Sequence, residues 1–282
     1  TRGEKLLVLV GRPYNLYDTG VNLDLPRTIA EQGLDVLPLD LMDPDLSLLG
    51  TRYRNVYWNY GQKILAALEE VARSDTLEAV YLTNFSCGPD SFLLTYAEEI
   101  MGARPFLALE LDEHGSDAGY QTRIEAFFDV LRRGNRNAPR LRPDPAAAVD
   151  FRDRTIWLPG MHEFGTHFFA AAFRRHGYRA RALPDEDRES FELGRSLTRG
   201  SECLPTALTI GTFVKALRRE NGGGRHALFM PTAQGPCRFG QYATLHRQIL
   251  DREGHGDVAI LSPSSANAYQ GVVELLRRSL LK

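Results

Sequence analysis

The stretch LLVLVG at Leu6–Gly11 is a short apolar run that ends at a glycine. A run of this length without polar alternation predicts a buried strand of a parallel sheet. A stretch with helical spacing follows at Leu25–Gln32, and a second short apolar run follows at Val36–Leu39. Strand-length runs and helix-length stretches continue to alternate along the chain. This alternation predicts an α/β fold, in which helices cover parallel sheets.

The alternation divides the chain into two halves. Further elements are expected in the first half as strands at Ala79–Leu82 and Phe106–Leu111 and helices at Val56–Arg73, Phe92–Met101 and Gln121–Arg133. From Gly134 to Asp153 the periodicity disappears, and prolines with scattered arginines predict a linker. In the second half, strands are expected at Thr155–Leu158, Tyr178–Ala182, Ala227–Met230 and Val258–Leu261. Helices are expected there at Thr166–His176, Glu189–Thr198, Ala207–Arg219, Tyr242–Arg252 and Val272–Leu280.

These boundaries predict two flavodoxin-like or Rossmann-like lobes whose parallel sheets face a central cleft. The expected N-terminal α/β lobe covers residues 1–135, the linker covers residues 136–153, and the C-terminal α/β lobe covers residues 154–282. Because the chain begins at Thr1 rather than at a methionine, we expect it to be a piece of a longer polypeptide.

The composition narrows the class of protein. The chain has 282 residues, of which 43% are hydrophobic and 25% charged, and this excludes a disordered chain. A formal net charge of −2 argues against nucleic-acid binding. The sequence has neither an apolar run long enough to span a membrane nor a basic and apolar leader. We therefore expect a cytoplasmic protein that binds neither nucleic acid nor membrane.

The three cysteines fall at comparable places in the predicted elements. Cys87 and Cys237 each follow a predicted strand and precede a helix, and Cys203 lies at the amino end of a predicted helix. In open α/β sheets, ligands bind beyond the carboxyl ends of the strands, where these cysteines are expected. Helix amino ends also favour thiolates, because their free N–H groups and positive dipole lower a thiol pKa. The pattern indicates a site built from cysteine.

Several readings of this pattern stay open. Thiolates select zinc, copper(I) or iron–sulfur clusters. Structural zinc normally has four ligands, often in close cysteine pairs, and no such pair occurs here, although a histidine as fourth ligand keeps zinc open. An iron–sulfur cubane with three protein ligands fits three dispersed cysteines better. Free cysteine also commonly serves as a small buried apolar residue, which would leave the thiols inert.

Five segments carry a resemblance to a known family. They are GRPYNLYDTGVNLDLPR (Gly11–Arg27), NFSCGPDSF (Asn84–Phe92), ELDEHGSDAGYQTRIEAF (Glu110–Phe127), GSECLPTALTIG (Gly200–Gly211) and PTAQGPCRFGQY (Pro231–Tyr242). In this order they resemble the 2-hydroxyacyl-CoA dehydratase superfamily. More narrowly, they resemble the cluster-binding segment of activase-related fusion proteins and the double-cubane cluster proteins. The resemblance extends from Leu6 to about Ala268.

The resemblance implies a cofactor and a partner. It implies that Cys87, Cys203 and Cys237 bind a [4Fe-4S] cluster, or half of an [8Fe-9S] double cubane, between two lobes. It also implies that an ATP-dependent activase, separate or fused upstream, delivers low-potential electrons for use on a small substrate, with an acyl-CoA as one candidate. The chain has no G-x-x-x-x-G-K-S/T motif, so we expect no ATP site in it. A homodimer or heterodimer is expected, and whether this chain is itself an enzyme stays open.

Three further residues are candidates for contacts around such a cluster. Glu110 and His114 belong to an acidic group at a predicted strand end, where they would relay a proton or tune the cluster potential. Arg238 follows Cys237 and would offset the negative charge of a cluster. A solvated loop and a surface arginine are the alternatives. The alternative function is a two-lobed ligand-binding or docking domain with structural cysteines and no redox chemistry.

Overall fold

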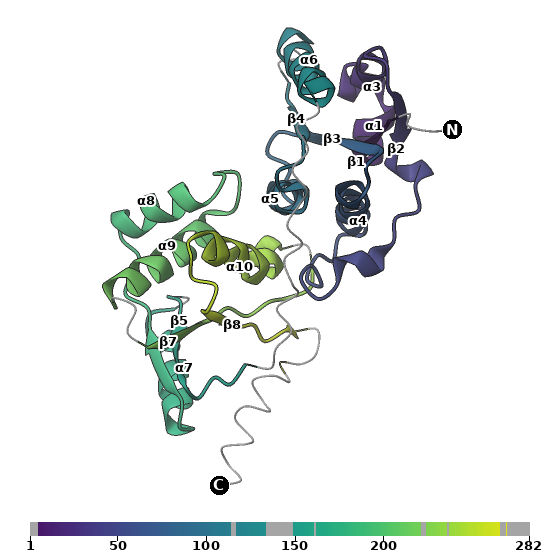
Figure 1. Ribbon diagram of the computed structural model, residues 1–282. Coiled ribbons are helices and arrows are strands. Elements are labelled where there is room, and N and C mark those ends of the chain that lie inside the picture. Colours follow the sequence, from purple (N-terminus) through teal and green to yellow (C-terminus); the bar gives the residue numbers. More distant parts are fainter. Residues whose placement is uncertain are drawn as a thin grey trace. The chain divides into compact units, whose positions relative to one another are not determined.

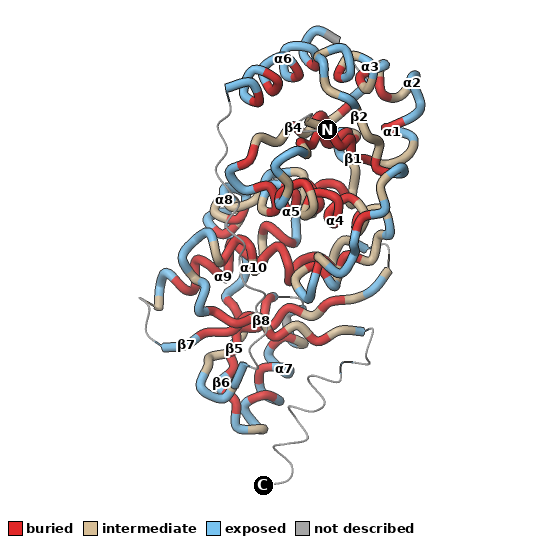
Figure 2. Tube along the Cα trace, turned by 45° about the vertical axis from the view of Figure 1, so that its right-hand side comes forward, coloured by how far each residue is buried: buried red, intermediate tan, exposed pale blue. Residues whose placement is uncertain are grey.

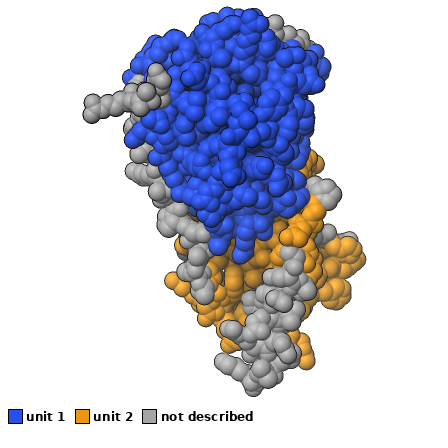
Figure 3. Space-filling view, turned by 90° about the vertical axis from the view of Figure 1, so that its right-hand side faces the viewer, with its two compact units in different colours: residues 1–145 blue, residues 146–282 orange. Residues whose placement is uncertain are grey.

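The computed structural model describes residues 5–113, 117–133, 149–160, 162–220, 224–235, 237–265 and 269. Two compact units divide the chain, Thr1–Pro145 (unit 1) and Ala146–Lys282 (unit 2), as coloured in Figure 3. This division lies inside the expected linker, most of which is outside the described residues. Among the described residues, every helix is too short or too polar to cross a membrane.

Unit 1 is built on a sheet of four parallel strands in the order β2-β1-β3-β4. The strands are β1 (Leu6–Gly11), β2 (Asp35–Pro38), β3 (Leu77–Asn84) and β4 (Leu107–Leu111). The helices are α1 (Pro13–Tyr17), α2 (Thr19–Asn22), α3 (Leu25–Ala30), α4 (Asn59–Arg73), α5 (Asp90–Met101) and α6 (Asp117–Arg133), with short 3-10 helices at Leu39–Leu41 and Leu46–Leu49. Figure 1 shows α4 and α5 on one face of the sheet and α3 and α6 on the other.

The apolar runs of unit 1 explain where its core lies. The side chains of Leu7 to Val10 in β1 are fully buried, because helices cover both faces of this central strand (Figure 2). The short helices α1 and α2 were not expected from the sequence. Tyr14 and Tyr17 of α1 are about half exposed, so α1 has no apolar repeat that would have predicted it.

Unit 2 has the same strand arrangement, in the order β6-β5-β7-β8, again with all neighbours parallel. Its strands are β5 (Arg154–Leu158), β6 (Arg179–Ala182), β7 (Arg225–Phe229) and β8 (Ala259–Leu261). Its helices are α7 (Glu163–Arg175), α8 (Arg188–Leu197), α9 (Leu204–Arg219) and α10 (Tyr242–Arg252), with a 3-10 helix, η3, at Arg238–Gln241. The expected helix at Val272–Leu280 lies outside the described residues.

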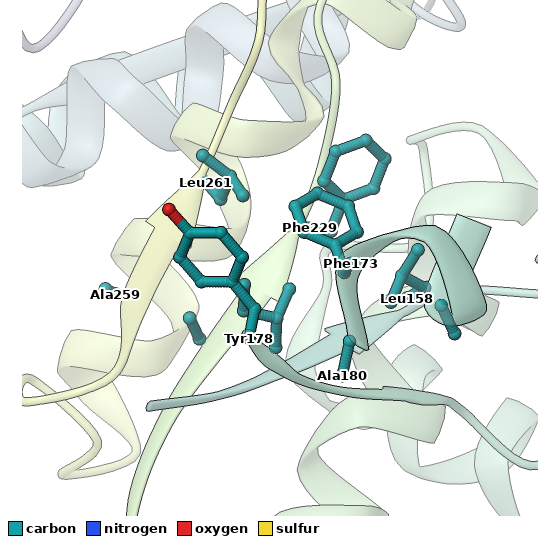
Figure 4. Packing of buried hydrophobic residues seen from close by; sticks show 10 residues of the cluster. Leu158, Phe173, Tyr178, Ala180, Phe229, Ala259 and Leu261 are labelled. Atoms are coloured by element: carbon teal, nitrogen blue, oxygen red, sulfur yellow. The ribbon is translucent and has the colours of Figure 1, made fainter. Parts of the chain in front are cut away.

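The two faces of the unit 2 sheet are packed differently. On one face, alternate strand residues meet the inner side of α7 in a cluster that includes Leu158, Phe173, Phe229 and Leu261 (Figure 4). Helices α8, α9 and α10 lie on the other face (Figure 1). There α8 and α9 approach very closely: a Cβ on Gly211 would lie 1.9 Å from the Ser190 carbonyl oxygen. Two glycines, Gly194 and Gly211, therefore permit this helix contact.

The chain is thus an α/β protein of two units, each with a four-stranded parallel sheet between helices. In each unit the first strand lies inside the sheet, the second strand pairs at one side of it, and the third and fourth pair at the other. This is the strand order of a doubly wound sheet, whose ligand edge is at the carboxyl ends of the strands. The fold class expected from the sequence is confirmed.

Candidate functional site

Cys87 lies in the tight turn between β3 and α5. The strand runs to Asn84, two residues further than expected, and the Cys87 amide donates to the Asn84 carbonyl at 3.0 Å. Ser86 has a φ of 61°, and this left-handed residue turns the chain back toward the helix. The Cys87 carbonyl then accepts from the Ser91 amide at 3.0 Å. Backbone bonds on both sides hold the half-buried Cys87 just before α5.

A charged group surrounds this cysteine, and we call Arg12, Thr83, Cys87 and Asp90 the Cys87 network. Arg12 follows β1 and Thr83 lies near the end of β3, so the pairing of these strands brings the two together. Arg12 Nη2 lies 2.8 Å from Asp90 Oδ1, and the Thr83 hydroxyl donates to the other oxygen of Asp90. The Asp90 side chain is only 1% exposed and that of Arg12 is 17% exposed. Asp90 is therefore a buried carboxylate with two side-chain partners.

Within the Cys87 network, some groups raise the pKa of the Cys87 thiol and others lower it. Burial raises the pKa of the Cys87 thiol, and the nearby Asp90 carboxylate raises that pKa further. The Asp90 backbone N–H and the Arg12 guanidinium act in the other direction, because both donate toward the sulfur. Burial thus favours the neutral thiol of Cys87, while two N–H donors are directed at the sulfur.

The cysteines of unit 2 lie at two helix starts. Cys203 is the N-cap residue of α9, which begins at Leu204 rather than at the expected Ala207, because Pro205 fits the first turn of a helix. Cys237 is the N-cap residue of η3, which leads directly into α10. Neither cysteine uses its side chain to cap its helix.

Cys203 and Cys237 share one environment although they are far apart in the sequence. The Tyr242 hydroxyl forms a hydrogen bond with Cys203, and its pKa is raised by burial and further by the charges of Cys203 and Cys237. Arg238 Nη1 also donates to the Ser201 carbonyl at 3.5 Å, which ties the two cysteine loops together. Within unit 2 the two thiols therefore lie beside the same tyrosine.

The layer behind this pair is polar but neutral. His246 of α10 is fully buried, and its Nε2 lies 3.1 Å from the Thr206 hydroxyl of α9. Burial lowers the pKa of His246 to about 4, although a hydrogen bond with the Thr206 backbone opposes this. His246 is thus an uncharged imidazole at neutral pH, and it joins the N-terminal parts of α9 and α10.

The three residues expected around the cysteines have different outcomes. Glu110 is the register partner of Thr83 in the neighbouring strand, so it lies one strand away from the Cys87 network on the same face of the sheet. It is part of β4 rather than of the loop that follows. His114 lies outside the described residues. Arg238 is half-buried and is bonded to the Cys203 loop, which makes it more than a solvated surface arginine.

The donor set suits a thiolate-bound cofactor in its chemistry. None of the three cysteines forms a disulfide, and one lies in unit 1 and two lie in unit 2. Within either unit, the described part of the chain brings no three histidine, cysteine or carboxylate side chains together as a metal site. Cysteine thiols and hydrogen bonds to sulfur are features that iron–sulfur sites use, and N–H donors are directed at the Cys87 sulfur here.

Comparison with known proteins adds little to this geometry. No family model matches the chain, and no curated protein is significantly similar to it. Among solved structures, the chain is similar to the C-terminal part of E. coli RcsC, residues 700–949, which contains a linker region and a phosphoreceiver domain. That alignment covers 99% of this chain and 94% of the other at 11% identity, with a TM-score of 0.21. A TM-score this low carries no argument about fold or function.

Sequence reasoning did not find the partners of the cysteines. Asp90 and Tyr242 were absent from the expected site, although each lies a few residues after a cysteine, at the start of a helix. Their position in the first turn, next to a candidate ligand, was a usable signal. Thr83 gave no such signal, because its role depends on the side-chain direction within β3.

Proposed function

We propose that this chain is an iron–sulfur redox protein of the 2-hydroxyacyl-CoA dehydratase type, with Cys87, Cys203 and Cys237 as cluster ligands. The observation that carries the proposal is the shared environment of Cys203 and Cys237 beside Tyr242. Two thiols from different helix starts, placed beside one tyrosine near the carboxyl edge of a parallel sheet, support a thiol-bound ligand. The resemblance of the cysteine segments supports the choice of an iron–sulfur cluster.

Residues of this chain would donate hydrogen bonds to the cysteine sulfurs or hold those donors in place. When bound, a [4Fe-4S] cluster, or half of an [8Fe-9S] double cubane, supplies one-electron chemistry at low potential. The Asp90 amide and the Arg12 guanidinium donate to Cys87, which offsets negative charge on that sulfur. The Tyr242 hydroxyl likewise forms a hydrogen bond with Cys203 and offsets negative charge there. Asp90 and Thr83 fix the direction of the Arg12 side chain.

The partner and the substrate follow from the same proposal. The sequence holds no phosphate loop, so a separate or upstream ATP-dependent activase would supply the low-potential electron. The electron would pass to a small substrate, and an acyl-CoA thioester is the candidate that the resemblance favours. Glu110, one strand away from the Cys87 network, is the described carboxylate that we assign to tuning the charge around Cys87.

Iron and acid-labile sulfide analysis with EPR on protein purified without oxygen tests the proposal. We expect a brown protein with about four iron and four sulfide per chain, or about eight iron and nine sulfide where a double cubane is shared by a dimer. A colourless wild-type protein that stays free of iron after anaerobic reconstitution would overturn the proposal in favour of a binding or docking domain. Stoichiometric zinc in place of iron would overturn it as well.

Single substitutions identify the ligands. Cys87→Ser, Cys203→Ser and Cys237→Ser should each reduce bound iron several-fold, because a hydroxyl is a poor substitute for a thiolate. Ser201→Ala is the matched control, since it removes a hydroxyl two residues before Cys203 and should keep the wild-type iron content. Loss of iron in the variants of unit 2 alone would exclude Cys87 from the ligand set.

A further inference from the structure

Unit 2 contains two cysteines, whereas Cys87 is the single cysteine of unit 1. Cys203 and Cys237, which we call the thiol pair, come from different loops. The Tyr242 hydroxyl forms a hydrogen bond with Cys203 and also lies within reach of the charge of Cys237. Two thiols that the fold brings into one environment have a reaction open to them that a single thiol lacks, because they can join in a disulfide.

Contacts around the thiol pair hold its two loops to each other. Arg238, the residue after Cys237, donates to the carbonyl of Ser201, two residues before Cys203, at 3.5 Å. In the helices that follow the two cysteines, His246 of α10 is fully buried and lies 3.1 Å from a hydroxyl in the first turn of α9. The two helix starts that carry the thiols are therefore tied together both at the surface and in the interior of unit 2.

The backbone on either side of each thiol suits a cross-link. Both cysteines have extended N-cap conformations, and the carbonyl of each accepts a backbone amide of the turn that follows, from Thr206 at 3.0 Å and from Gly240 at 3.4 Å. Neither cysteine side chain caps its helix. A bond between the two sulfurs would therefore leave both helix starts intact.

The two thiols differ in their access to solvent. Cys237 is exposed, whereas Cys203 is half-buried. Small oxidants react first with the more accessible thiol, and a second thiol nearby then resolves the oxidised sulfur. The exposures thus give Cys237 the first role and Cys203 the second.

We propose that Cys203 and Cys237 form a reversible disulfide within unit 2 when they carry no metal and the chain meets hydrogen peroxide. The Cys237 sulfur attacks one peroxide oxygen, the O–O bond breaks, and a sulfenic acid and one water form. The Cys203 sulfur then attacks the Cys237 sulfur, the S–S bond forms, and the sulfenic oxygen leaves as a second water with the remaining thiol proton. The peroxide gains two electrons, and each sulfur loses one. A dithiol reductant reverses the reaction and is itself oxidised to a disulfide.

The consequence for the site rests on the proposed function. If the three cysteines are cluster ligands, the disulfide withdraws two of them, so the protein must be reduced before iron can bind. The disulfide itself depends only on the thiol pair and forms whether or not the chain ever binds iron.

Peptide mapping by mass spectrometry under non-reducing conditions tests the proposal. The full chain is reduced, freed of metal with a chelator and given stoichiometric hydrogen peroxide at neutral pH. Trypsin places the three cysteines on separate peptides, because arginine or lysine lies between each pair. We expect the Cys203 peptide linked to the Cys237 peptide, with Cys87 still open to alkylation. The link should form about ten times faster or more in the native chain than in urea, because the fold holds the two thiols together.

Serine variants assign the bond. Cys203→Ser and Cys237→Ser should each abolish the cross-link, and Cys87→Ser, which changes the cysteine of unit 1, is the matched control and should keep it. Hydrogen exchange of the β5 and β7 amides reports whether each variant stays folded.

Four results would overturn the proposal. The first is a cross-link that involves Cys87 in the native chain. The second is a cross-link that forms no faster in the native chain than in urea. The third is a yield that rises with protein concentration, which would mean a bond between two chains. The fourth is oxidation of Cys237 to a sulfinic acid without a cross-link. All four are read on metal-free protein, so they are distinct from a failure of the iron analysis that tests the proposed function.

Discussion

Units 1 and 2 have the same strand order, but they hold their cysteines in different surroundings. In unit 1 a buried ion pair between Arg12 and Asp90 flanks Cys87. In unit 2, Tyr242 and the cation Arg238 lie beside Cys203 and Cys237, while the buried hydrogen bond between Thr206 and His246 is uncharged. The same strand order is therefore compatible with different charged residues around the cysteines. The strands fix where the chain turns, and the residues after each turn supply the charge.

The comparison also extends to how the helices are packed. Unit 2 depends on a close helix contact at Gly194 and Gly211, whereas Gly119 in α6 of unit 1 has open space around it. Glycine is thus a packing requirement in unit 2 and a replaceable residue in α6. Since the two units need not unfold together, hydrogen exchange of the strands in each unit is the measurement that separates their stabilities.

The largest expected effect breaks the helix contact of unit 2. Gly211→Ala should lower the free energy of unfolding of unit 2 by about 4 kcal/mol or more, because the new Cβ would lie 1.9 Å from a carbonyl oxygen. Amide exchange of β5 and β7 measures the loss. Gly119→Ala is the control in unit 1 and should be neutral or stabilise by up to about 1 kcal/mol. Similar losses for the two variants would contradict the packing argument.

The next effect removes the charged partner of Asp90. Arg12→Gln should destabilise unit 1 by about 3 kcal/mol, because it leaves a carboxylate that is 1% exposed without its cation. Arg238→Gln in unit 2 should lose less than about 1 kcal/mol, since Arg238 donates to a carbonyl at 3.5 Å rather than to a buried charge. Hydrogen exchange of the β1 and β3 amides measures the effect of Arg12→Gln. Equal losses of unfolding free energy in Arg12→Gln and Arg238→Gln would contradict the expected difference between the two arginines.

The pH dependence caused by His246 should appear in the free energy of unfolding of unit 2 and not in that of unit 1. The pKa of buried His246 is lowered to about 4 from an ordinary 6.5, so between these values the unfolded chain binds a proton that the folded chain does not. The free energy of unfolding therefore falls as the pH falls through this window, by about 2 kcal/mol from pH 7 to pH 5, and levels off below pH 4.

His246→Gln keeps a hydrogen-bonding group and should remove this pH dependence from unit 2. Unit 1 contains a single histidine, His114, and serves as the internal reference in the same exchange experiment. A pH dependence of unit 2 that is unchanged in His246→Gln would mean that other groups titrate there.

The smallest expected effect compares two buried threonines. Thr83→Val should destabilise unit 1 by about 2 kcal/mol, because its hydroxyl donates to the charged Asp90. Thr206→Val should destabilise unit 2 by about 1 kcal/mol, because the imidazole of His246 is neutral and keeps the Thr206 carbonyl within 3.2 Å. Chemical denaturation followed by hydrogen exchange of the strand amides measures both losses of unfolding free energy. A larger loss for Thr206→Val than for Thr83→Val would contradict the argument that the bond to charged Asp90 is the stronger one.

Most strands and long helices were predictable because local pattern decides them. The run at Leu6–Gly11 is a strand as expected, and the repeat ending at Arg73 is a helix, although that helix begins at Asn59 rather than at Val56. The short helices at Pro13–Tyr17 and Thr19–Asn22 were missed, because a single turn has no apolar repeat to detect.

The candidate site was predictable only in its cysteines. Their position after strands and at helix starts follows from the order of elements along the chain. The partners Asp90, Thr83 and Tyr242 depend on which strands pair and on the face that each residue occupies. Strand order is a long-range property, so no local window of sequence contains it.

The α/β alternation, the two halves and the positions of the three thiols follow from periodicity and residue type, which are local quantities. That Arg12 meets Asp90, and that Cys203 and Cys237 lie beside the same tyrosine, depends on the folded chain. Hydrogen bonds and ion pairs form over a few ångströms in space. Strand pairing and helix packing, rather than separation along the chain, set those distances.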